Sequence, residues 1–246
     1  MSAHPQLIFL AAPCGPSIKS AWLRTITDWS VAHDKDWYVT PLFAEHTAGR
    51  IDVSRSKIIS AQIELNAPWC ITLDTDARSL VPLNVLMGIL EEDRLDGHEL
   101  IVGPTMKADH LNTPQEEKKL LVWTKPEWGK NIRKDRPFRI TGAGLGFMAL
   151  SIGGARKLKV LAELNTIGGP NQDAKVPMYC ETTARMGEDN SLILNANDSG
   201  LSPVCDPRIL VGHMKEYEIC PASDMWEAMR QAALVELAKG ERPGSV

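Results

Sequence analysis

The sequence predicts an α/β fold in which a mostly parallel central sheet carries helices on both faces, with a smaller mixed sheet in the second half. Through residues 1–104, short continuous apolar runs alternate with longer segments whose apolar residues recur at helical spacing. Continuous apolar runs are typical of parallel strands that are covered on both faces. Since the chain has no internal repeat and no low-complexity linker, we expect one domain over residues 1–246.

The elements of the first half follow from these runs. Pro13 and Gly15 close the first apolar run, and Ser17 can cap a helix on which Trp22 and Trp29 recur. We expect strands at residues 7–12, 37–43, 69–73 and 99–104, and further helices at residues 52–66 and 82–95.

The alternation breaks after residue 104. Residues 105–139 contain a strand-like piece and then a charged, proline-containing stretch, and Ile140–Ser151 reads as strand, glycine turn and strand. Helices are expected at residues 153–164 and 188–199, and a short strand at residues 209–212 leads to His213. The segment 222–246 is expected to form an amphipathic helix and a tail, with the apolar positions Met225, Met229, Ala232 and Leu237.

Composition excludes several classes of protein. The formal charge of -4 argues against a dedicated binder of bulk nucleic acid, although a local basic face is compatible with it. The five cysteines include no CxxC pair, so no zinc knuckle or disulfide framework is indicated, and Cys70 is expected in the core. The apolar run Leu7–Ala12 is shorter than a signal-peptide core, and no run approaches the roughly 18 apolar residues of a membrane span. We therefore expect a soluble, cytoplasmic protein.

The stretch "WCITLDTDARSL" carries the first chemical signal, because a buried strand ends in Asp74 and Asp76. At 4 Å, two like charges repel by about 4 kcal/mol at an effective dielectric constant near 20. Such a pair needs solvent, a basic side chain or a cation. In parallel sheets, ligands bind at the carboxyl ends of strands, which is where the pair lies.

Three further features follow along the chain. A glycine turn "GAGLG" covers residues 142–146, Glu188 and Asp189 open a helix, and His213 follows a glycine at a strand end. Each has a purely structural explanation: a tight hairpin, a favourable charge at a helix N-terminus, and a hydrogen-bonded core histidine.

Taken in order, "LDTDARSLVPLNVL", "ITGAGLGFMALS", "MGEDNSLILNANDSG" and "ILVGHMK" resemble motifs of glycosyltransferases with the GT-A fold. The resemblance covers Leu7 to about Lys215 and is nearest to the family 2 type and its small bacterial and phage relatives. It implies metal-dependent transfer of a sugar from a nucleoside-diphosphate sugar to an acceptor hydroxyl, with inversion favoured over retention. A UDP-sugar is the expected donor, and Mn²⁺ or Mg²⁺ the expected metal. Residues 1–104 become the nucleotide-binding half, and residues 105–221 the acceptor and metal half.

The resemblance also implies roles for individual residues. Asp189 corresponds to the catalytic base, and Glu188 would hold the acceptor or a loop. The expected metal ligands are Asp74, Asp76 and His213. The expected donor-binding positions are Ala12, Pro13, Glu45, Arg55, Asp74, Gly142, Ala143 and Gly144.

Other functions stay open. The segment 123–139 combines Trp123 and Trp128 with basic residues, which suits a sugar or phosphate acceptor and raises the alternative of a transferase acting on hydroxymethylated DNA bases. A second alternative is a non-catalytic module that binds nucleotide-sugar or glycan. A third is a haloacid-dehalogenase-type phosphatase, whose motif expects Thr or Val where this chain has Arg78.

Overall fold

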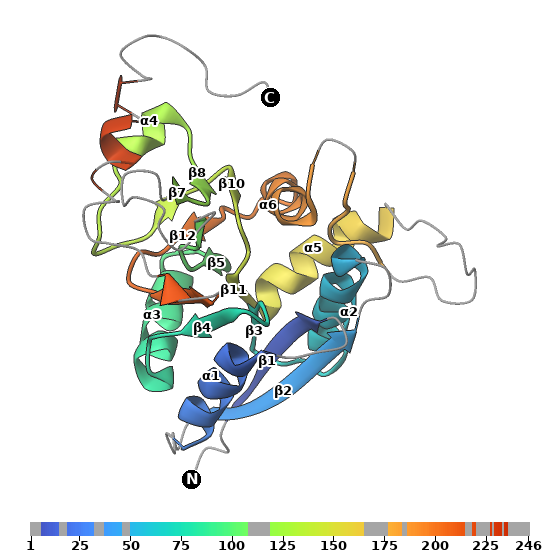
Figure 1. The fold of residues 1–246 in the computed structure, drawn as a ribbon. Coiled ribbons are helices and arrows are strands. Elements are labelled where there is room, and N and C mark those ends of the chain that lie inside the picture. Colours follow the sequence, from blue (N-terminus) through green and yellow to red (C-terminus); the bar gives the residue numbers. More distant parts are fainter. Residues whose placement is uncertain are drawn as a thin grey trace.

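The computed structural model describes residues 6–14, 19–31, 37–45, 50–107, 119–164, 177–183, 186–214 and 218–219, and from the C-terminal segment 227, 229–232 and 234–235. These residues form one large sheet between layers of helices (Figure 1). No helix among them has both the length and the apolar character needed to cross a membrane.

The central sheet has seven strands, in the spatial order β2 (Trp37–Glu45), β1 (Gln6–Cys14), β3 (Trp69–Leu73), β11 (Phe147–Ser151), β5 (Leu100–Val102), β12 (Val204–Cys205) and β9 (Phe138–Arg139). β1 is parallel to both β2 and β3, and β12 is parallel to β5. β11 is inserted between β3 and β5 and is antiparallel to both, and β9 is antiparallel to β12. The expected α/β class is confirmed, and the sheet is mixed and partly parallel.

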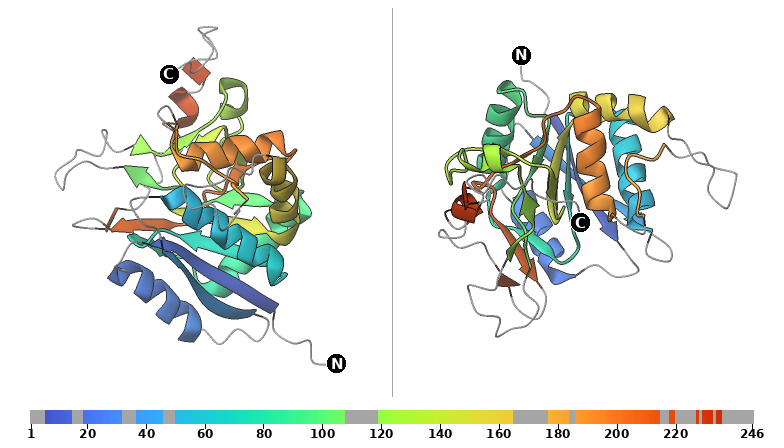
Figure 2. Two further views of the ribbon diagram at one scale, coloured as in Figure 1. Left: turned by 90° about the vertical axis from the view of Figure 1, so that its right-hand side faces the viewer. Right: turned by 90° about the horizontal axis from the view of Figure 1, so that it is seen from above.

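Helices cover both faces of the sheet, as expected (Figure 2). α1 (Ser20–Val31) and α3 (Leu83–Leu95) pack into the core on one face. α2 (Ile51–Glu64), α5 (Ile152–Leu164) and α6 (Glu188–Asp198) pack into the core on the other face. The loops that join strands to helices therefore meet along the edges of the sheet, where a ligand site can form.

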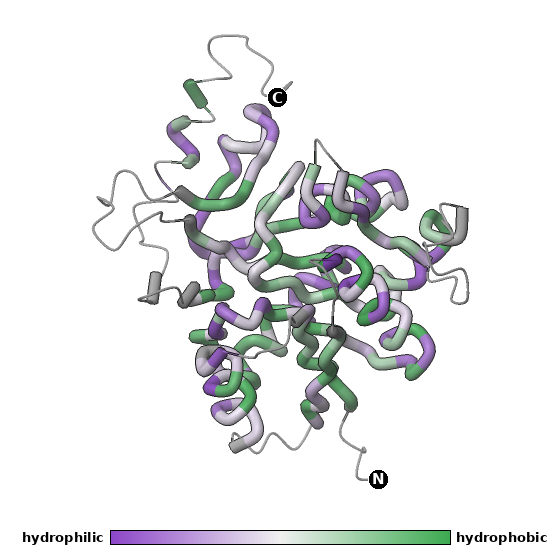
Figure 3. The backbone as a smooth tube through the Cα atoms, turned by 45° about the vertical axis from the view of Figure 1, so that its right-hand side comes forward, coloured by the Kyte–Doolittle hydropathy of each residue, from purple (hydrophilic) through white to green (hydrophobic). Residues whose placement is uncertain are grey.

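The continuous apolar strands are explained by this two-sided packing. Along β1, Ile8 joins the core that contains Trp22 of α1, whereas the next residue, Phe9, packs with Ile58 of α2. Adjacent side chains of a strand point to opposite faces, so a strand between two helical layers needs apolar residues at every position. Figure 3 shows hydrophobic residues gathered along the central strands. Cys70 of β3 is buried, which confirms its predicted place in the core.

Short strands outside the central sheet extend it toward the site. β4 (Ala77–Ser79) pairs with β13 (Val211–Met214), which also pairs with β14 (Glu218–Ile219). β10 (Gly142–Ala143) pairs with β8 (Val122–Trp123), β6 (Met106–Lys107) pairs with β7 (Lys119–Leu120), and α4 (Pro126–Gly129) follows β8. The expected hairpin at residues 140–151 does not form, because β10 pairs with β8 while β11 joins the central sheet. His213 lies inside β13 and does not follow its end.

The C-terminal segment is described only in part. Residues 227, 229–232 and 234–235 are helical, and Met229 packs against the core on the side of α5 and α6. The predicted apolar positions Met225 and Leu237 lie outside the described residues.

A buried charge cluster joins α3 to the turn after β12, away from the predicted site. Arg208 Nη2 lies 2.7 Å from Asp206 Oδ2 and 3.0 Å from Asp93 Oδ1, and both carboxylates are buried. Burial, and then the charge of Asp206, raise the pKa of Asp93 to about 8. One guanidinium faces two buried carboxyl groups, so a proton on Asp93 is favoured near neutral pH.

Candidate functional site

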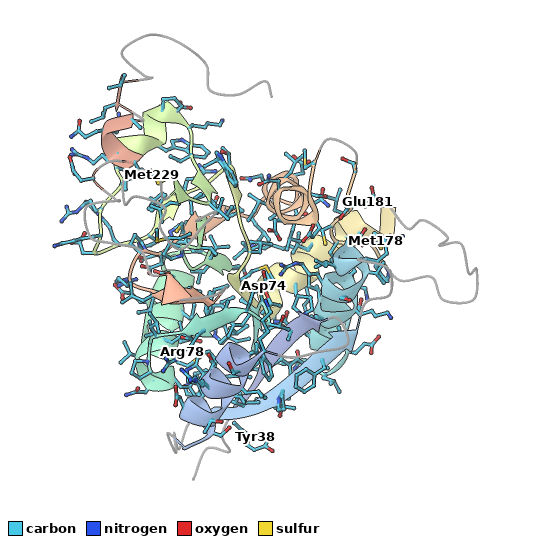
Figure 4. All side chains as sticks on the ribbon, in the orientation of Figure 1. Tyr38, Asp74, Arg78, Met178, Glu181 and Met229 are labelled. Carbon is cyan, nitrogen blue, oxygen red and sulfur yellow. The ribbon has the colours of Figure 1, made fainter. Side chains whose placement is uncertain are left out.

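The carboxyl ends of β1, β2 and β3 form one edge of the sheet. Ala11 lies opposite both Leu42 and Thr72, so Pro13 of β1 stands level with Asp74, which follows β3. Figure 4 shows Asp74 near the centre of the molecule. The predicted acidic pair therefore lies at the carboxyl edge of parallel strands, the position that the sequence indicated.

Three predicted donor positions lie on this edge. Ala12 and Pro13 are buried, and the Ala12 methyl belongs to the core with α1, so Ala12 can offer a ligand only its backbone. The backbone of Glu45 ends β2 opposite Cys14, and its side chain lies outside the described part of the chain.

Arg55 of α2 links the two ends of the site. Its Nη2 lies 3.1 Å from Asp74 Oδ1 and 3.2 Å from Asp189 Oδ1, and the same nitrogen donates to the carbonyl of Leu145 at 3.4 Å. The Arg55 side chain is 2% exposed, whereas the two carboxylates are 34% and 30% exposed. One buried cation thus holds the carboxylate after β3 and the carboxylate that opens α6 beside each other, with their outer sides open to solvent.

Arg55 stays positively charged in this position. Burial alone would lower its pKa, but the charges of Asp74 and Asp189 outweigh that effect and raise the pKa above its ordinary value. Its Nε and Nη1 are buried without a hydrogen-bond partner among the described residues. Unpaired donors on a buried guanidinium lower the stability of the fold. The main effect of Arg55 is therefore the positive charge that it places at the site.

The glycine segment fixes Asp189 and Asp74 through its backbone. The N–H of Leu145 donates to Asp189 Oδ2 at 3.1 Å, and the N–H of Asp74 donates to the carbonyl of Gly146 at 3.1 Å. Glu188 and Asp189 both lie in the first turn of α6, where Gly187 is the N-cap residue. The predicted glycine, acidic-pair and Glu-Asp motifs thus meet at one place.

Gly142 is required by packing. A Cβ at Gly142 would lie 2.6 Å from Asn190 Oδ1 and 3.2 Å from Trp123 Cε3, so a side chain has no room. A Cβ at Gly144 would press on Leu121, and Ala143 is buried. These three predicted donor positions are accounted for by the packing of β10 against its neighbours.

Asp76, the second residue of the acidic pair, contacts a different basic side chain from Asp74. Its Oδ2 is 3.5 Å from Lys19 Nζ, just before α1, and its side chain is 26% exposed. The next residue, Ala77, begins β4 and lies opposite His213 of β13. The backbone of His213 is therefore beside the acidic pair, as the metal hypothesis requires, while its side chain lies outside the described part of the chain.

Among the side chains that the structure describes, no group of three or more His, Cys, Asp or Glu residues is arranged to hold a metal ion. The two aspartates alone do not make such a group. Of the three predicted ligands, the side chains of Asp74 and Asp76 lie within the described part of the chain.

Trp123 lies exposed at the edge of this site. Its backbone pairs with Gly142, its ring approaches the position of Asn190, and 49% of the residue is accessible to solvent. Trp128, the second tryptophan of the segment, is instead covered by cations, with Lys125 Nζ 4.9 Å and Arg139 Cζ 4.4 Å from its ring centre. Of these two tryptophans, Trp123 is therefore the more exposed and the one that lies beside the glycine segment.

Two contributors were missed from the sequence. Lys19 follows the first strand in "GPSIKSAW", and a basic residue after a parallel strand could have been recognised as a neighbour of the acidic pair, since carboxyl ends share an edge. The Leu145 N–H is a backbone group that no residue pattern marks.

Comparison with known proteins places the fold. No family model matches the sequence, and no curated protein matches it. Among solved structures, the chain resembles A197 from STIV, with a TM-score of 0.50 and 15% identity over 89% of this chain and 91% of that one. It also resembles GalNAc-T7, solved with UDP, GalNAc and Mn2+, with a TM-score of 0.50 and 12% identity over 87% of this chain and 43% of that one.

At such identities a likeness defines the fold alone. The chain has a GT-A-like α/β fold, the fold of glycosyltransferases, which confirms the expected architecture. The chain spans less than half the length of the GalNAc-T7 structure.

Proposed function

We propose that this protein is a metal-dependent glycosyltransferase that moves a sugar from a nucleoside-diphosphate sugar to an acceptor hydroxyl, with inversion. The observation that carries the proposal is the contact of Arg55 Nη2 with both Asp74 and Asp189. It joins the carboxylate beside the expected donor phosphates to the carboxylate expected to act as base. A GT-A-like fold with these groups at the carboxyl edge of its sheet supports the same reading.

Asp74, Asp76 and His213 would hold a divalent cation brought by the donor, since carboxylate oxygens are ligands that Mg²⁺ and Mn²⁺ prefer and Mn²⁺ also accepts imidazole. Asp76 is the proposed direct ligand, because Asp74 faces the buried guanidinium of Arg55, whereas Asp76 Oδ2 lies 3.5 Å from the exposed amine of Lys19, which a cation can displace. His213, on the strand beside Ala77, is the proposed third group. When bound, Mn²⁺ or Mg²⁺ neutralises charge that builds on the diphosphate leaving group.

Asp189 is the proposed base. The Leu145 N–H donates to its Oδ2, and its Oδ1 lies 3.2 Å from Arg55 Nη2 as an ion pair without a hydrogen bond, so the carboxylate is held from two sides. A carboxylate held in this way, with 30% of its side chain exposed, can receive the proton of an entering hydroxyl. Glu188, in the same turn of α6, is proposed to hold the acceptor.

The backbone of residues 12 and 13 and the carboxylate of Asp74 are proposed to receive the nucleoside. A UDP-sugar is the proposed donor, by analogy with the UDP in the GalNAc-T7 structure. The decisive experiment is a thermal-shift panel of UDP-, GDP- and CDP-sugars with and without Mn²⁺, followed by a turnover assay on the donors that bind. A Mn²⁺-dependent shift with release of nucleoside diphosphate supports the proposal. No shift with any donor overturns it.

The alternatives are separated by the same experiment. A binding module would show the shift without turnover in the presence of any acceptor. For a phosphatase, Asp74 would have to be a free nucleophile, but its Oδ1 is paired with Arg55, and Arg78 reaches across to Asp28 on α1 at 3.4 Å.

A further inference from the structure

The turn before β9 concentrates positive charge that the proposed sugar transfer does not use. Residues 125–139 hold six basic and two acidic residues, a formal charge of +4, in a chain whose formal charge is -4. The same segment lines a hollow of about 720 Å³, closed on its other side by the C-terminal helical residues. The basic residues of the hollow are Lys130, Arg133, Lys134, Arg136 and Arg230.

The hollow is a built structure. Ile132 and Phe138 are buried in the core on either side of the turn. The backbones of Arg133 and Arg136 pair across it as an isolated antiparallel β-bridge. Arg230 donates to the carbonyl of Lys130 at 3.4 Å, which ties the C-terminal helix to the turn. The backbone that carries these charges is thus fixed before any ligand arrives, which lowers the entropy cost of binding.

The internal carboxylates leave part of this charge unbalanced. Arg133 pairs with Asp135 at 3.0 Å, and Arg230 pairs with Glu227 at 3.3 Å. Within the part of the chain that the structure describes, no ion pair neutralises the other three basic residues, which are all exposed: Lys130, Lys134 and Arg136. Three uncompensated cations in one hollow repel each other, and an anionic ligand removes that repulsion.

The lining also indicates what kind of anion fits. Its one apolar residue, Ile132, is 2% exposed, so the hollow presents the methylene stems and charged ends of Lys and Arg but no exposed apolar side chain that would hold a lipid chain or the hydrophobic anchor of an acidic peptide. The ring of Trp128 is partly buried and already contacts two cations, Lys125 and Arg139. Recognition by charge alone, in a concave site, suits the phosphodiester backbone of a nucleic acid.

We infer that this hollow binds the phosphodiester backbone of a nucleic-acid strand. The strand's role as acceptor, or as carrier of the acceptor group, rests on the proposed sugar transfer, but its binding does not. β8, whose Trp123 pairs with Gly142 of the glycine segment, leads directly into this segment, so the hollow and the candidate site are carried by consecutive elements of the chain.

Fluorescence anisotropy on the full chain tests the inference without donor or metal, so its outcome is independent of the proposed transfer. The probes are dye-labelled 20-nucleotide single strands of DNA and RNA and the matching DNA duplex, at 50 and 200 mM salt. With three phosphate contacts, raising the salt fourfold should weaken single-strand binding roughly 20-fold and duplex binding roughly 40-fold. The comparison of the three probes identifies which strand is preferred.

The variant Lys134→Glu/Arg136→Glu should bind at least tenfold more weakly, with a salt dependence reduced by about two contacts. Arg24→Glu/Arg156→Glu is the matched control, because it makes the same change in net charge at exposed positions on α1 and α5. Three results would overturn the inference: no binding at 50 mM salt, equal weakening in the control, or binding to phosphatidylserine vesicles but to no nucleic acid.

Discussion

Arg55 Nη2 lies 3.2 Å from Asp189 Oδ1, which places a buried positive charge of α2 against the carboxylate that opens α6. The same nitrogen holds Asp74 at 3.1 Å, so one side chain orients both candidate carboxylates. The partly exposed outer sides of these carboxylates are the part of the site that a substrate can reach.

Replacing Arg55 with Met should destabilise the fold by only about 1 kcal/mol, since the two carboxylates lose their shared cation and repel each other, but their contact with water limits this cost. Arg55→Lys should lose less, because its ammonium keeps the charge but cannot span both partners. Urea unfolding measures both, with Arg24→Met on the exposed face of α1 as the control. An unfolding free energy in Arg55→Met equal to that of the control would mean that the contact does not stabilise the fold.

Asp76→Ala should abolish metal-dependent donor hydrolysis and transfer, because it removes the carboxylate best placed to ligate the cation. Asp198→Ala, at the exposed end of α6, should leave activity unchanged. Initial rates over a Mn²⁺ titration make the comparison. Full activity in Asp76→Ala would refute the metal assignment.

Asp189→Asn should leave the affinity for the donor near normal and lower turnover by about 10²–10⁴-fold, the usual contribution of a positioned base. The amide oxygen of Asn can still accept from the Leu145 N–H, so the local fold is kept. Glu188→Gln is the paired variant and should raise the KM for acceptor more than it lowers kcat. An unaffected rate in Asp189→Asn would place the base elsewhere.

Trp123→Ala should raise the KM for acceptor about tenfold, because an exposed ring beside the glycine segment is suited to stacking on a sugar or base. Donor hydrolysis in water should not change, and Trp123→Phe should restore most of the affinity. Trp128→Ala is the control, since its ring is already covered by two cations. If both Ala variants lose acceptor affinity equally, Trp123 has no special role.

Stability should fall as the pH rises from about 4, the ordinary carboxyl value, to about 8, the raised pKa of Asp93. In this range the folded state keeps a proton that the unfolded state has released, so the free energy of unfolding decreases by up to about 1.4 kcal/mol per pH unit. Asp93→Asn should flatten this slope. Urea unfolding at pH 5, 6, 7 and 8 measures it, with Glu92→Gln, at the same arginine, as the control. An unchanged slope in Asp93→Asn would show that another group causes it.

Much of the architecture could be predicted because apolar runs end sharply. β3 has the predicted bounds, Trp69–Leu73, since Pro68 and Asp74 frame a run that is apolar except for Thr72. The direction of β11 could not be predicted, because a strand buried on both faces has the same composition whether it runs parallel or antiparallel. β4 was missed because its three residues are too few to show a pattern and include Arg78.

The sequence predicted which residues belong to the candidate site better than it predicted the contacts between them. Arg55 was expected near the nucleotide, but its reach to Asp189 depends on how α2 and α6 pack over the same face, which no local pattern encodes. Likewise, the side-by-side position of His213 and Ala77 is a long-range strand pairing. Such pairings are set by the whole fold and not by neighbouring residues.

The pairing of β4 with β13 also has a kinetic consequence. The acidic pair is synthesised in the first third of the chain, but the strand that lies beside it comes from the last fifth. A growing chain on the ribosome would therefore carry the acidic pair without its neighbouring strand through most of its synthesis. The proposed dication site could be completed only after nearly all of the polypeptide has emerged. Contacts between residues far apart in the sequence slow folding, so the ability to bind a dication should appear late and in one step.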